Sequence, residues 1–476
     1  MSDIKEQIIK NPIIPIRQTF LDVYSNAIVP WSFNNSHSLD LKAICFFVST
    51  GFFPDDATYY NQIKVIPPAT IIDNDDPIKA KTYWQWHYSP RDISFKQAVE
   101  EFAHVFETIT LEQTHNKKII LPLSGGLDSR SQAAALDKHS QVFAYSYKFK
   151  NGIPETEYGE AIAKVQGYKF KSFTIEPNYL WGVIEHLADI NRCFSEFTHP
   201  RQMAIHKDFS EMGELFFLGH WGDVLFDDMG VSADLTNEDL VKVIYKKVIK
   251  KGGLELAERL WNFWGLSGTF EDYLMEKILN ALEQTGIENA NTRLRAYKSL
   301  QWAPRWTSNN LSIFEDKHPL ALPYYHDEIC KFICTIPEEY LAGRKIQIAY
   351  IKDKAPQLAN IPWQTFDPCN LYNYQKFNSF QNMIIRGARK YKNKMKATIL
   401  RKPVILRNWE LQFLGPKNEV HLENYLFNND KFNQFIPHNL VKEFYSNFKQ
   451  KDQVWYSHPL SMLLTLSLFS SRHFNS

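Results

Sequence analysis

The segment LPLSGGLDSR at residues 121–130 constrains the fold more than any other part of this 476-residue chain. An apolar run at 119–123 predicts a β-strand, and an Ala-rich run at 131–138 predicts a helix. Gly125 and Gly126 allow a tight turn between the two. A strand, a glycine turn and a helix in direct succession predict the first unit of a parallel α/β sheet.

The same alternation continues along the chain. Further apolar runs predict three strands, at residues 142–149, 170–175 and 215–219. Helical spacing predicts a helix between each successive pair of these strands, at residues 157–166 and 179–190. The fourth strand ends in GHWGD, a second glycine-rich loop. Ligands of such sheets bind at the carboxyl ends of the strands, so both loops are candidate binding elements.

The first loop has the composition of an anion-binding turn. Ser124 and Ser129 supply hydroxyls, and the following helix directs its N-terminal amides at the same place. Asp128 would repel a phosphate unless Mg²⁺ lay between them. The loop lacks the Gly-Lys-Ser/Thr ending of a Walker A motif. A simple turn with a helix cap is the alternative interpretation, and the complete string favours binding.

The second loop adds another carboxylate. Asp223 follows the predicted strand at 215–219 and could share a metal ion with Asp128. An Asp after a Gly is equally common as a helix N-cap. Taken alone, the residues leave both interpretations open.

Together, SGGLDS and LGHWGDVLF resemble the synthetase domain of class B asparagine synthetases, within the ATP-pyrophosphatase superfamily. The resemblance implies an adenine-nucleotide α-hydrolase-like parallel sheet, ATP and Mg²⁺ as cofactors, and cleavage of ATP between its α- and β-phosphates. It implies metal-ligand roles for Asp128 and Asp223. It also implies that the backbone at 144–147 lines the adenine, with an ordinary buried strand as the alternative. The residues that it implies as nucleotide contacts are Leu123, Ser124, Gly125, Gly126, Asp128, Ser129, Ser146 and Gly219.

Three positions of the second loop depart from the family pattern. Trp221 replaces its second Gly, and Val224 replaces the Glu after the Asp. His220 occupies the position of a Glu in asparagine synthetases, whereas lasso-peptide cyclases and other related proteins often have His there. A His could take a proton from an attacking amine, which makes His220 a candidate catalytic residue, with a structural role in the loop as the alternative.

A cation is needed beside the departing pyrophosphate, and the family uses a Lys. In GRKIQIAYIKDKAP, at residues 343–356, Lys345 matches that Lys best, and Lys352 is a rival. Upstream, Asp327 matches the Asp of a family segment whose Arg is absent here. A solvated helical Lys is the alternative for either candidate.

We divide the chain into residues 1–95 and 96–476. Residues 39–88 resemble the tail of a glutaminase domain, but Ser2 stands where that domain has its nucleophilic Cys. We expect a small α+β remnant that does not hydrolyse glutamine, followed by the ATP-pyrophosphatase domain with a helical C-terminal part. Short runs at 64–66 and 70–72 predict a β-hairpin, and residues 95–112 predict a helix.

The net charge is +1, and no CxxC pair is present among the five cysteines. Nucleic acid is therefore an unfavoured partner, and neither a disulfide framework nor a zinc ribbon is expected. Cys330 and Cys334 are predicted to be buried on one helix face. We expect no secretory signal, no membrane span and a cytoplasmic location. The basic run at 386–402 is a solvated helix or a surface for an anionic lipid, an acidic substrate or leader peptide, or a phosphate-bearing glycan carrier.

The predicted function is an ATP-dependent, AMP-forming carbon–nitrogen ligase acting on a small-molecule or peptide substrate. It adenylates a carboxylate and transfers the acyl group to an amine, either within one molecule, as in lasso-type cyclisation, or between two. The amine could also be ammonia from a partner glutaminase. A tRNA-modifying adenylase of the same superfamily and a catalytically inactive partner protein are the alternatives.

Overall fold

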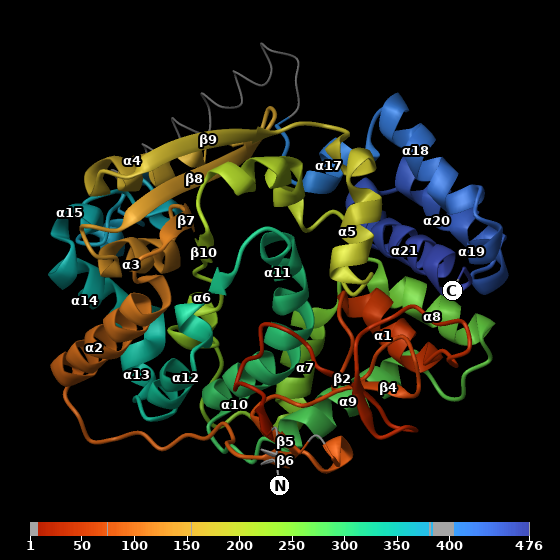
Figure 1. Ribbon diagram of the computed structural model, residues 1–476, viewed down its shortest axis with the longest axis horizontal. Coiled ribbons are helices and arrows are strands. Elements are labelled where there is room, and N and C mark those ends of the chain that lie inside the picture. Colours follow the sequence, from red (N-terminus) through yellow and green to blue (C-terminus); the bar gives the residue numbers. More distant parts are fainter. Residues whose placement is uncertain (1–7, 74, 154, 380–381, 384–403, 476) are drawn as a thin grey trace, which may run out of the picture.

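The computed structural model describes residues 8–73, 75–153, 155–379, 382–383 and 404–475. Its centre is a five-stranded parallel sheet in the order β11-β10-β7-β8-β9 (Figure 1). The strands are β7 (Lys118–Pro122), β8 (Gln141–Phe149), β9 (Lys169–Ile175), β10 (Leu215–Phe217) and β11 (Leu320–Ala321). The α/β class and the four strands predicted between residues 119 and 219 are confirmed.

The strand order reverses between β7 and β10. From β7 the chain moves outward through β8 and β9, and then returns to the other side of β7 to form β10. The loops that follow β7 and β10 therefore diverge at neighbouring carboxyl ends. Such a switch point is where ligands of open α/β sheets bind, and both glycine-rich loops leave the sheet there.

Helices surround the five-stranded sheet. The first is α2 (Phe95–Thr114), which begins with a capping box between Ser94 and Gln97. It is followed by α3 (Leu127–Ala135), α4 (Thr156–Gln166), η2 (Tyr179–Gly182), α5 (Ile184–Asn191), η3 (Arg201–Glu211) and α6 (Gly222–Leu225). The helices predicted at 95–112 and 157–166 are confirmed, and α3 begins four residues earlier than the predicted run at 131–138.

The N-terminal part contains two small antiparallel sheets, β1-β5-β6 and β3-β2-β4. Their elements are β1 (Ile8–Lys10), β2 (Phe20–Asp22), β3 (Ala27–Val29), α1 (Leu41–Thr50), β4 (Ile63–Val65), β5 (Thr70–Asp73), η1 (Pro77–Lys79) and β6 (Lys81–Thr82). The predicted hairpin is wrong, because β4 and β5 pair with different partners. Pro67 and Pro68 lie between them and have no amide hydrogen to continue a ladder.

The N-terminal part shares one core with the helical remainder of the chain. Tyr59 stacks on Phe469 of the last helix with ring centroids 3.8 Å apart. The buried Arg305 donates to the Phe53 and Ala57 carbonyls. In Figure 1 the N-terminal strands lie at the bottom, and α1 lies against α8.

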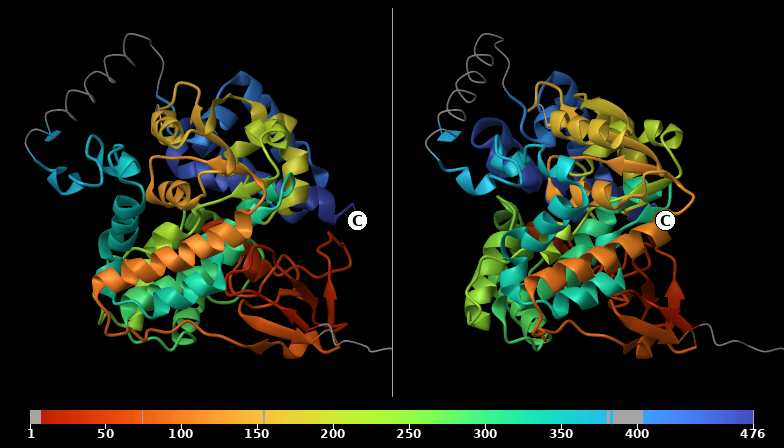
Figure 2. Two further views of the ribbon diagram at one scale, coloured as in Figure 1. Left: turned by 60° about the vertical axis from the view of Figure 1, so that its left-hand side comes forward. Right: turned by 90° about the vertical axis from the view of Figure 1, so that its left-hand side faces the viewer.

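Beyond residue 235 the described chain is mostly helical, as predicted. Figure 1 shows α14 and α15 beside the sheet, and Figures 1 and 2 show the C-terminal helices α17–α21, in blue, gathered together. The helices of this region are α7 (Asn237–Val248), α8 (Gly253–Phe263), α9 (Phe270–Glu283), α10 (Ala290–Tyr297), η4 (Lys298–Thr307), α11 (Ser308–Glu315), η5 (Pro323–Tyr325), α12 (Asp327–Cys334), α13 (Glu338–Leu341), η6 (Ala342–Arg344), α14 (Lys345–Lys354), α15 (Pro356–Ala359), η7 (Gln364–Phe366), η8 (Tyr374–Lys376), α17 (Asn408–Phe413), α18 (Pro416–Phe427), α19 (Asp430–Phe435), α20 (His438–Gln450) and α21 (Gln453–His473).

Three smaller predictions can be compared with this architecture. Cys330 and Cys334 are buried on α12, as predicted, and all five cysteines are free thiols. Within the described ranges, none of the helices combines the length and apolarity needed to cross a bilayer. The basic run at 386–402 lies outside the described residues.

Candidate functional site

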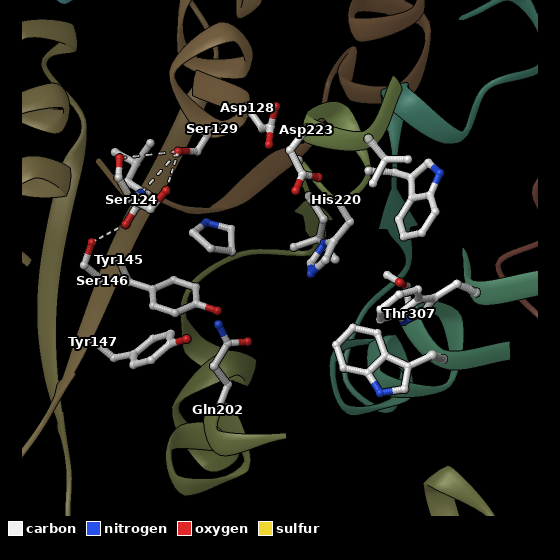
Figure 3. Close-up of a pocket in the computed structure, with 18 of the residues that line it drawn as sticks. Ser124, Asp128, Ser129, Tyr145, Ser146, Tyr147, Gln202, His220, Asp223 and Thr307 are labelled. Carbon is white, nitrogen blue, oxygen red and sulfur yellow. Dashed lines mark hydrogen bonds between the residues drawn. The ribbon is translucent and has the colours of Figure 1, made fainter. Parts of the chain in front are cut away.

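A cavity of about 600 Å³ lies at the carboxyl ends of β7, β8 and β10 (Figure 3). Both glycine-rich loops line it, together with side chains from η3, η4 and the turn before α14. Six of the eight residues predicted to contact the nucleotide line the cavity: Leu123, Ser124, Asp128, Ser129, Ser146 and Gly219. Gly125 and Gly126 belong to the same loop but are not part of the lining.

The first loop turns its hydroxyls onto its own amides. The Ser124 amide donates to Oγ of Ser129, and the Gly126 amide donates to Oγ of Ser124, each at 3.2 Å. An anion oxygen would be held by the same donors. Ser146 instead donates its hydroxyl to the Leu123 carbonyl, so its side chain joins β8 to the end of β7.

Behind this loop lies the fully buried guanidinium of Arg130. It donates to the carbonyls of Gly125, Ile361 and Pro362, with distances of 3.4, 2.9 and 2.9 Å. A charged group at 0% exposure is costly unless it is hydrogen-bonded, and here backbone carbonyls accept from both terminal nitrogens of the guanidinium, while Nε has no partner among the described residues. Arg130 thereby joins the loop to the segment after α15.

Asp128 and Asp223 lie side by side at one end of the cavity (Figure 3). Each is in the first turn of its helix, α3 for Asp128 and α6 for Asp223. Burial raises the pKa of Asp128 to about 6, with a further upward contribution from the charge of Asp223 and an opposing one from Arg344. Two carboxylates so arranged form a pair of oxygen ligands that suits Mg²⁺.

The close approach of the two loops depends on Gly222. A Cβ at this position would overlap the carboxylate of Asp128 and lie 2.9 Å from the ring of Tyr324. The absence of a side chain therefore lets the backbone beside Asp223 lie directly against Asp128. The predicted proximity of the two acids follows from this contact.

The cation that the structure brings to this pair is Arg344. Its guanidinium is paired with the Asp128 carboxylate, and the Gln347 amide donates to the same oxygen at 3.0 Å. Arg344 has a left-handed backbone with φ of 60°, at the turn between η6 and α14. This turn directs its side chain toward the cavity, which it lines.

Lys345, the predicted catalytic cation, lies outside the cavity lining. It is exposed, and its ammonium donates to the Glu339 carbonyl at 2.8 Å. Lys298 is a second cation in the lining. Burial lowers its pKa, and the charge of Asp223 opposes that shift, so the two side chains are electrostatic neighbours.

Trp221 has a backbone conformation that is unusual for a tryptophan. Its φ is 80°, in the left-handed region that glycine adopts at little cost. The indole is 7% exposed and donates to Oγ of Ser299 at 3.0 Å. Trp221 thus keeps the conformation of a glycine at the position where the resembling family has one, and packing and a hydrogen bond hold it there.

His220 lines the cavity next to this turn. Burial lowers its pKa to about 4, so the imidazole is neutral near pH 7. Among the described residues, nothing hydrogen-bonds to its buried Nδ1. A neutral imidazole without a partner at one nitrogen can accept a proton from a bound group.

The opposite wall is aromatic and comes from a region to which the sequence analysis assigned no site. Trp302, Trp306 and Thr307 line the cavity from η4, a continuous π-helical segment over Lys298–Thr307. Segments of π-helix are rare and occur frequently at functional sites. Their recognition requires backbone hydrogen bonds, which a single sequence does not reveal.

Tyr145, Tyr147 and Gln202 line the side nearest β8 (Figure 3). The Tyr147 hydroxyl accepts a hydrogen bond from Arg201 at 2.6 Å. Asp327, in contrast, lies away from the cavity and binds the N-terminal segment, accepting from the Ile13 amide and the Tyr83 hydroxyl at 3.0 Å each. Its match to the family segment therefore falls at a contact between the N-terminal part and the start of α12.

The cavity combines paired carboxylates, an amide and hydroxyl cradle, two cations, a neutral imidazole and an aromatic wall. Such a combination can hold a phosphorylated, aromatic ligand and stabilise negative charge as it develops. In comparisons with known proteins, no family model matches the chain and no curated protein matches it.

Proposed function

We propose that the chain is an ATP-dependent, AMP-forming ligase that activates a carboxylate and transfers the acyl group to an amine. The observation that carries the proposal is the meeting of Asp128 and Asp223 at the switch point, beside the Ser124–Ser129 turn. Two acids alone would reject a triphosphate. Acids beside an anion cradle favour a nucleotide that arrives with a divalent ion.

The residues present suit Mg²⁺. Asp128 and Asp223 would hold it, and when bound the ion would offset the charge of the phosphates. In the structure Asp128 is paired with Arg344, so the guanidinium and the ion would share or exchange this carboxylate. A guanidinium can also bind phosphate in a two-pronged fashion, which fits a role for Arg344 on the departing pyrophosphate.

The reaction has two steps in this proposal. A substrate carboxylate oxygen attacks the α-phosphorus, the bond to the β-phosphate oxygen breaks, and pyrophosphate leaves toward the Ser124–Ser129 turn. An amine then attacks the acyl carbon and AMP departs. The amine must lose a proton to become an amide, and His220, neutral and with Nδ1 unpartnered among the described residues, is suited to accept it.

The aromatic side chains give the proposal its substrate-binding surfaces. Tyr145 and Tyr147, on β8, suit stacking or edge contacts with a base, and Trp302 and Trp306 suit an apolar acyl or amine substrate on the other side. A peptide or small molecule with both a carboxylate and an amine would fit between them. The net charge of +1 disfavours tRNA as substrate.

The experiment that tests the proposal is exchange of labelled pyrophosphate into ATP, measured with the purified chain, Mg²⁺ and panels of carboxylates. Exchange that depends on a carboxylate supports adenylation. Binding of ATP without exchange across the panels would favour the inactive alternative, and absence of ATP binding by calorimetry with Mg²⁺ would refute a nucleotide site.

The second step is tested by adding amines and following AMP and amide formation. In this step we expect His220→Ala to slow amide formation by about 100-fold, as for a lost general base, while exchange of pyrophosphate is retained. Equal loss of both reactions would assign His220 to nucleotide binding instead.

A further inference from the structure

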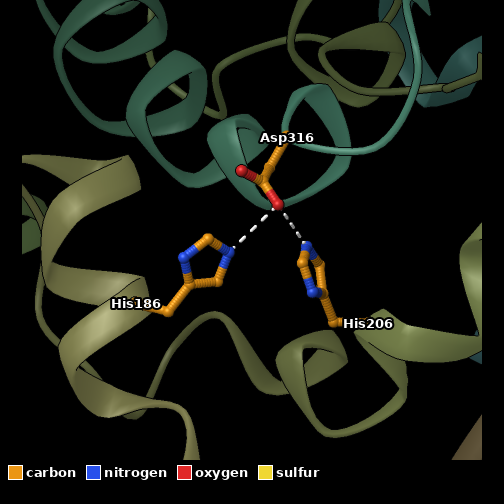
Figure 4. Close-up of side chains that lie close together, drawn as sticks. All are labelled: His186, His206 and Asp316. Carbon is orange, nitrogen blue, oxygen red and sulfur yellow. Dashed lines mark hydrogen bonds and ion pairs between the residues drawn. The ribbon is translucent and has the colours of Figure 1, made fainter.

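Away from the cavity, three metal-binding side chains from distant parts of the sequence meet at one point (Figure 4). They are His186 on α5, His206 on η3 and Asp316, which immediately follows α11. One ligand atom from each lies within 4.8 Å of the other two. Within the described residues, this is the sole group of three or more His, Cys, Asp or Glu side chains so arranged.

The two imidazoles approach the same carboxylate oxygen. Nε2 of His186 lies 3.0 Å from Oδ2 of Asp316, and Nε2 of His206 lies 2.9 Å from it. Two ligands on one tetrahedral zinc ion, with bonds of about 2.0–2.1 Å, are separated by about 3.3 Å. Each imidazole nitrogen is thus already at nearly the distance from the carboxylate oxygen that a shared ion requires, and the two nitrogens lie within 4.8 Å of each other.

The buried side chain of His206 adds a second observation. His206 is 6% exposed, and its Nε2 lies 2.9 Å from Oδ2 of Asp316 without the alignment of a hydrogen bond, whereas Nε2 of His186 makes a hydrogen bond to the same oxygen. Such an unsatisfied nitrogen costs free energy. Ligands of one metal ion point at the ion and not at each other, and the His206–Asp316 pair, close but out of line, has this arrangement.

We propose that His186, His206 and Asp316 form a site for a divalent transition-metal ion of the zinc class. Two imidazoles and one carboxylate are ligands that Zn²⁺ and Co²⁺ accept readily, and Mg²⁺ prefers an all-oxygen environment. His186 is 48% exposed, which leaves a side of the site open to water as the fourth ligand. Lys317 Nζ lies 3.8 Å from Oδ2 of Asp316 and would turn outward when the ion binds.

The position of the site suggests what the ion does. Its ligands come from three separate elements, two of which lead directly to the cavity walls. The η3 segment also carries Gln202, and α11 directly continues the π-helical segment that carries Trp306 and Thr307. An ion bound by all three side chains would connect η3 and the end of α11 to each other and to α5. The site is separate from the Asp128–Asp223 pair, and its ion would hold the two walls in place.

The test is metal binding by the full chain after treatment with a chelator. We expect one equivalent of Zn²⁺ to bind in the presence of excess Mg²⁺, and Co²⁺ to give visible absorption bands. His186→Ala should weaken Zn²⁺ binding at least tenfold, because one of three protein ligands is lost. His186 lies on the surface, so the variant should fold, and circular dichroism checks this.

Two controls separate this site from others. His104→Ala, which removes an exposed histidine on α2, should leave Zn²⁺ binding unchanged, as should Asp223→Asn at the cavity. Zn²⁺ should raise the unfolding temperature of the wild type but not of His186→Ala, and should slow amide exchange within residues 201–211. Absence of Zn²⁺ binding, or equal affinity in His186→Ala and the wild type, would overturn the proposal.

Discussion

The guanidinium of Arg344 is paired with the carboxylate of Asp128, 216 positions away in the sequence. The pair joins the turn before α14 to the loop after β7, at the entrance to the switch point. Gln347, one helical turn on, donates to the same carboxylate and to the Tyr324 hydroxyl. The surroundings of Asp128 are therefore built from distant parts of the chain: the two glycine-rich loops and the start of α14.

The first prediction concerns this cation. If Arg344 stabilises the charge of departing pyrophosphate, Arg344→Ala should lower kcat/KM for exchange by about 100-fold. Lys345→Ala should change it less than about threefold, because its ammonium is exposed and bonded to a backbone carbonyl. The kinetics of pyrophosphate exchange in the two variants show which of the two neighbouring residues is the catalytic cation. A larger effect at Lys345 than at Arg344 would support the prediction from the sequence.

The second prediction concerns the carboxylates. Asp223→Asn should reduce Mg²⁺-dependent exchange by about 100-fold while the fold is retained, since the amide is nearly isosteric but is a weaker metal ligand. The matched control is Asp228→Asn, an exposed position five residues further along. Titration of each variant with Mg²⁺ measures the effect, and full activity of Asp223→Asn would remove this residue from the metal site.

The third prediction concerns the left-handed backbone at Trp221. Replacing the indole by either Gly or Ala should destabilise the protein by about 3–5 kcal/mol through lost packing. The Gly variant should nevertheless be more stable than the Ala variant by about 1 kcal/mol, because a φ of 80° strains any residue with a Cβ. Denaturant unfolding measures the difference.

Val224 provides the comparison, because it lies within α6. There the Ala variant should be the more stable of the pair, as is usual in helices. The same order at both positions would mean that the conformation of Trp221 does not strain its backbone.

The fourth prediction concerns pH. Burial lowers the pKa of His458 to about 3, and its Nε2 lies 2.9 Å from the Val48 carbonyl. The unfolded chain binds a proton to this His below about pH 6.5 whereas the folded chain does not. The stability contributed by the neutral ring is thus complete above pH 6.5 and is lost as the pH falls toward 3.

His458→Gln keeps a donor but cannot titrate. The free energy of unfolding should therefore fall less steeply with decreasing pH between 6.5 and 4 in this variant, by up to about 1 kcal/mol per pH unit. Urea unfolding at several pH values gives both slopes. Identical slopes would show that His458 is protonated equally in both states.

Much of the sheet could be predicted from the sequence. The runs that became β7 and β10 are short, apolar and followed by glycines, and those that became β8 and β9 alternate with helical segments, so neighbours along the chain define each unit. Which strands pair with each other was harder to predict from the sequence. The hairpin expected at residues 64–66 and 70–72 failed because both strands found partners elsewhere in the N-terminal part.

The sequence by itself determined which residues turn at the sheet edge, because glycine, serine and aspartate act there through their own backbone and side chains. The tertiary structure alone decided which cation meets Asp128. Arg344 has a left-handed backbone in the turn before α14, and Lys345 is the first residue of that helix, so which of the two neighbours faces Asp128 depends on this turn and on how α14 packs. The same holds for the aromatic wall of η4 and for His186, His206 and Asp316, which only folding brings together.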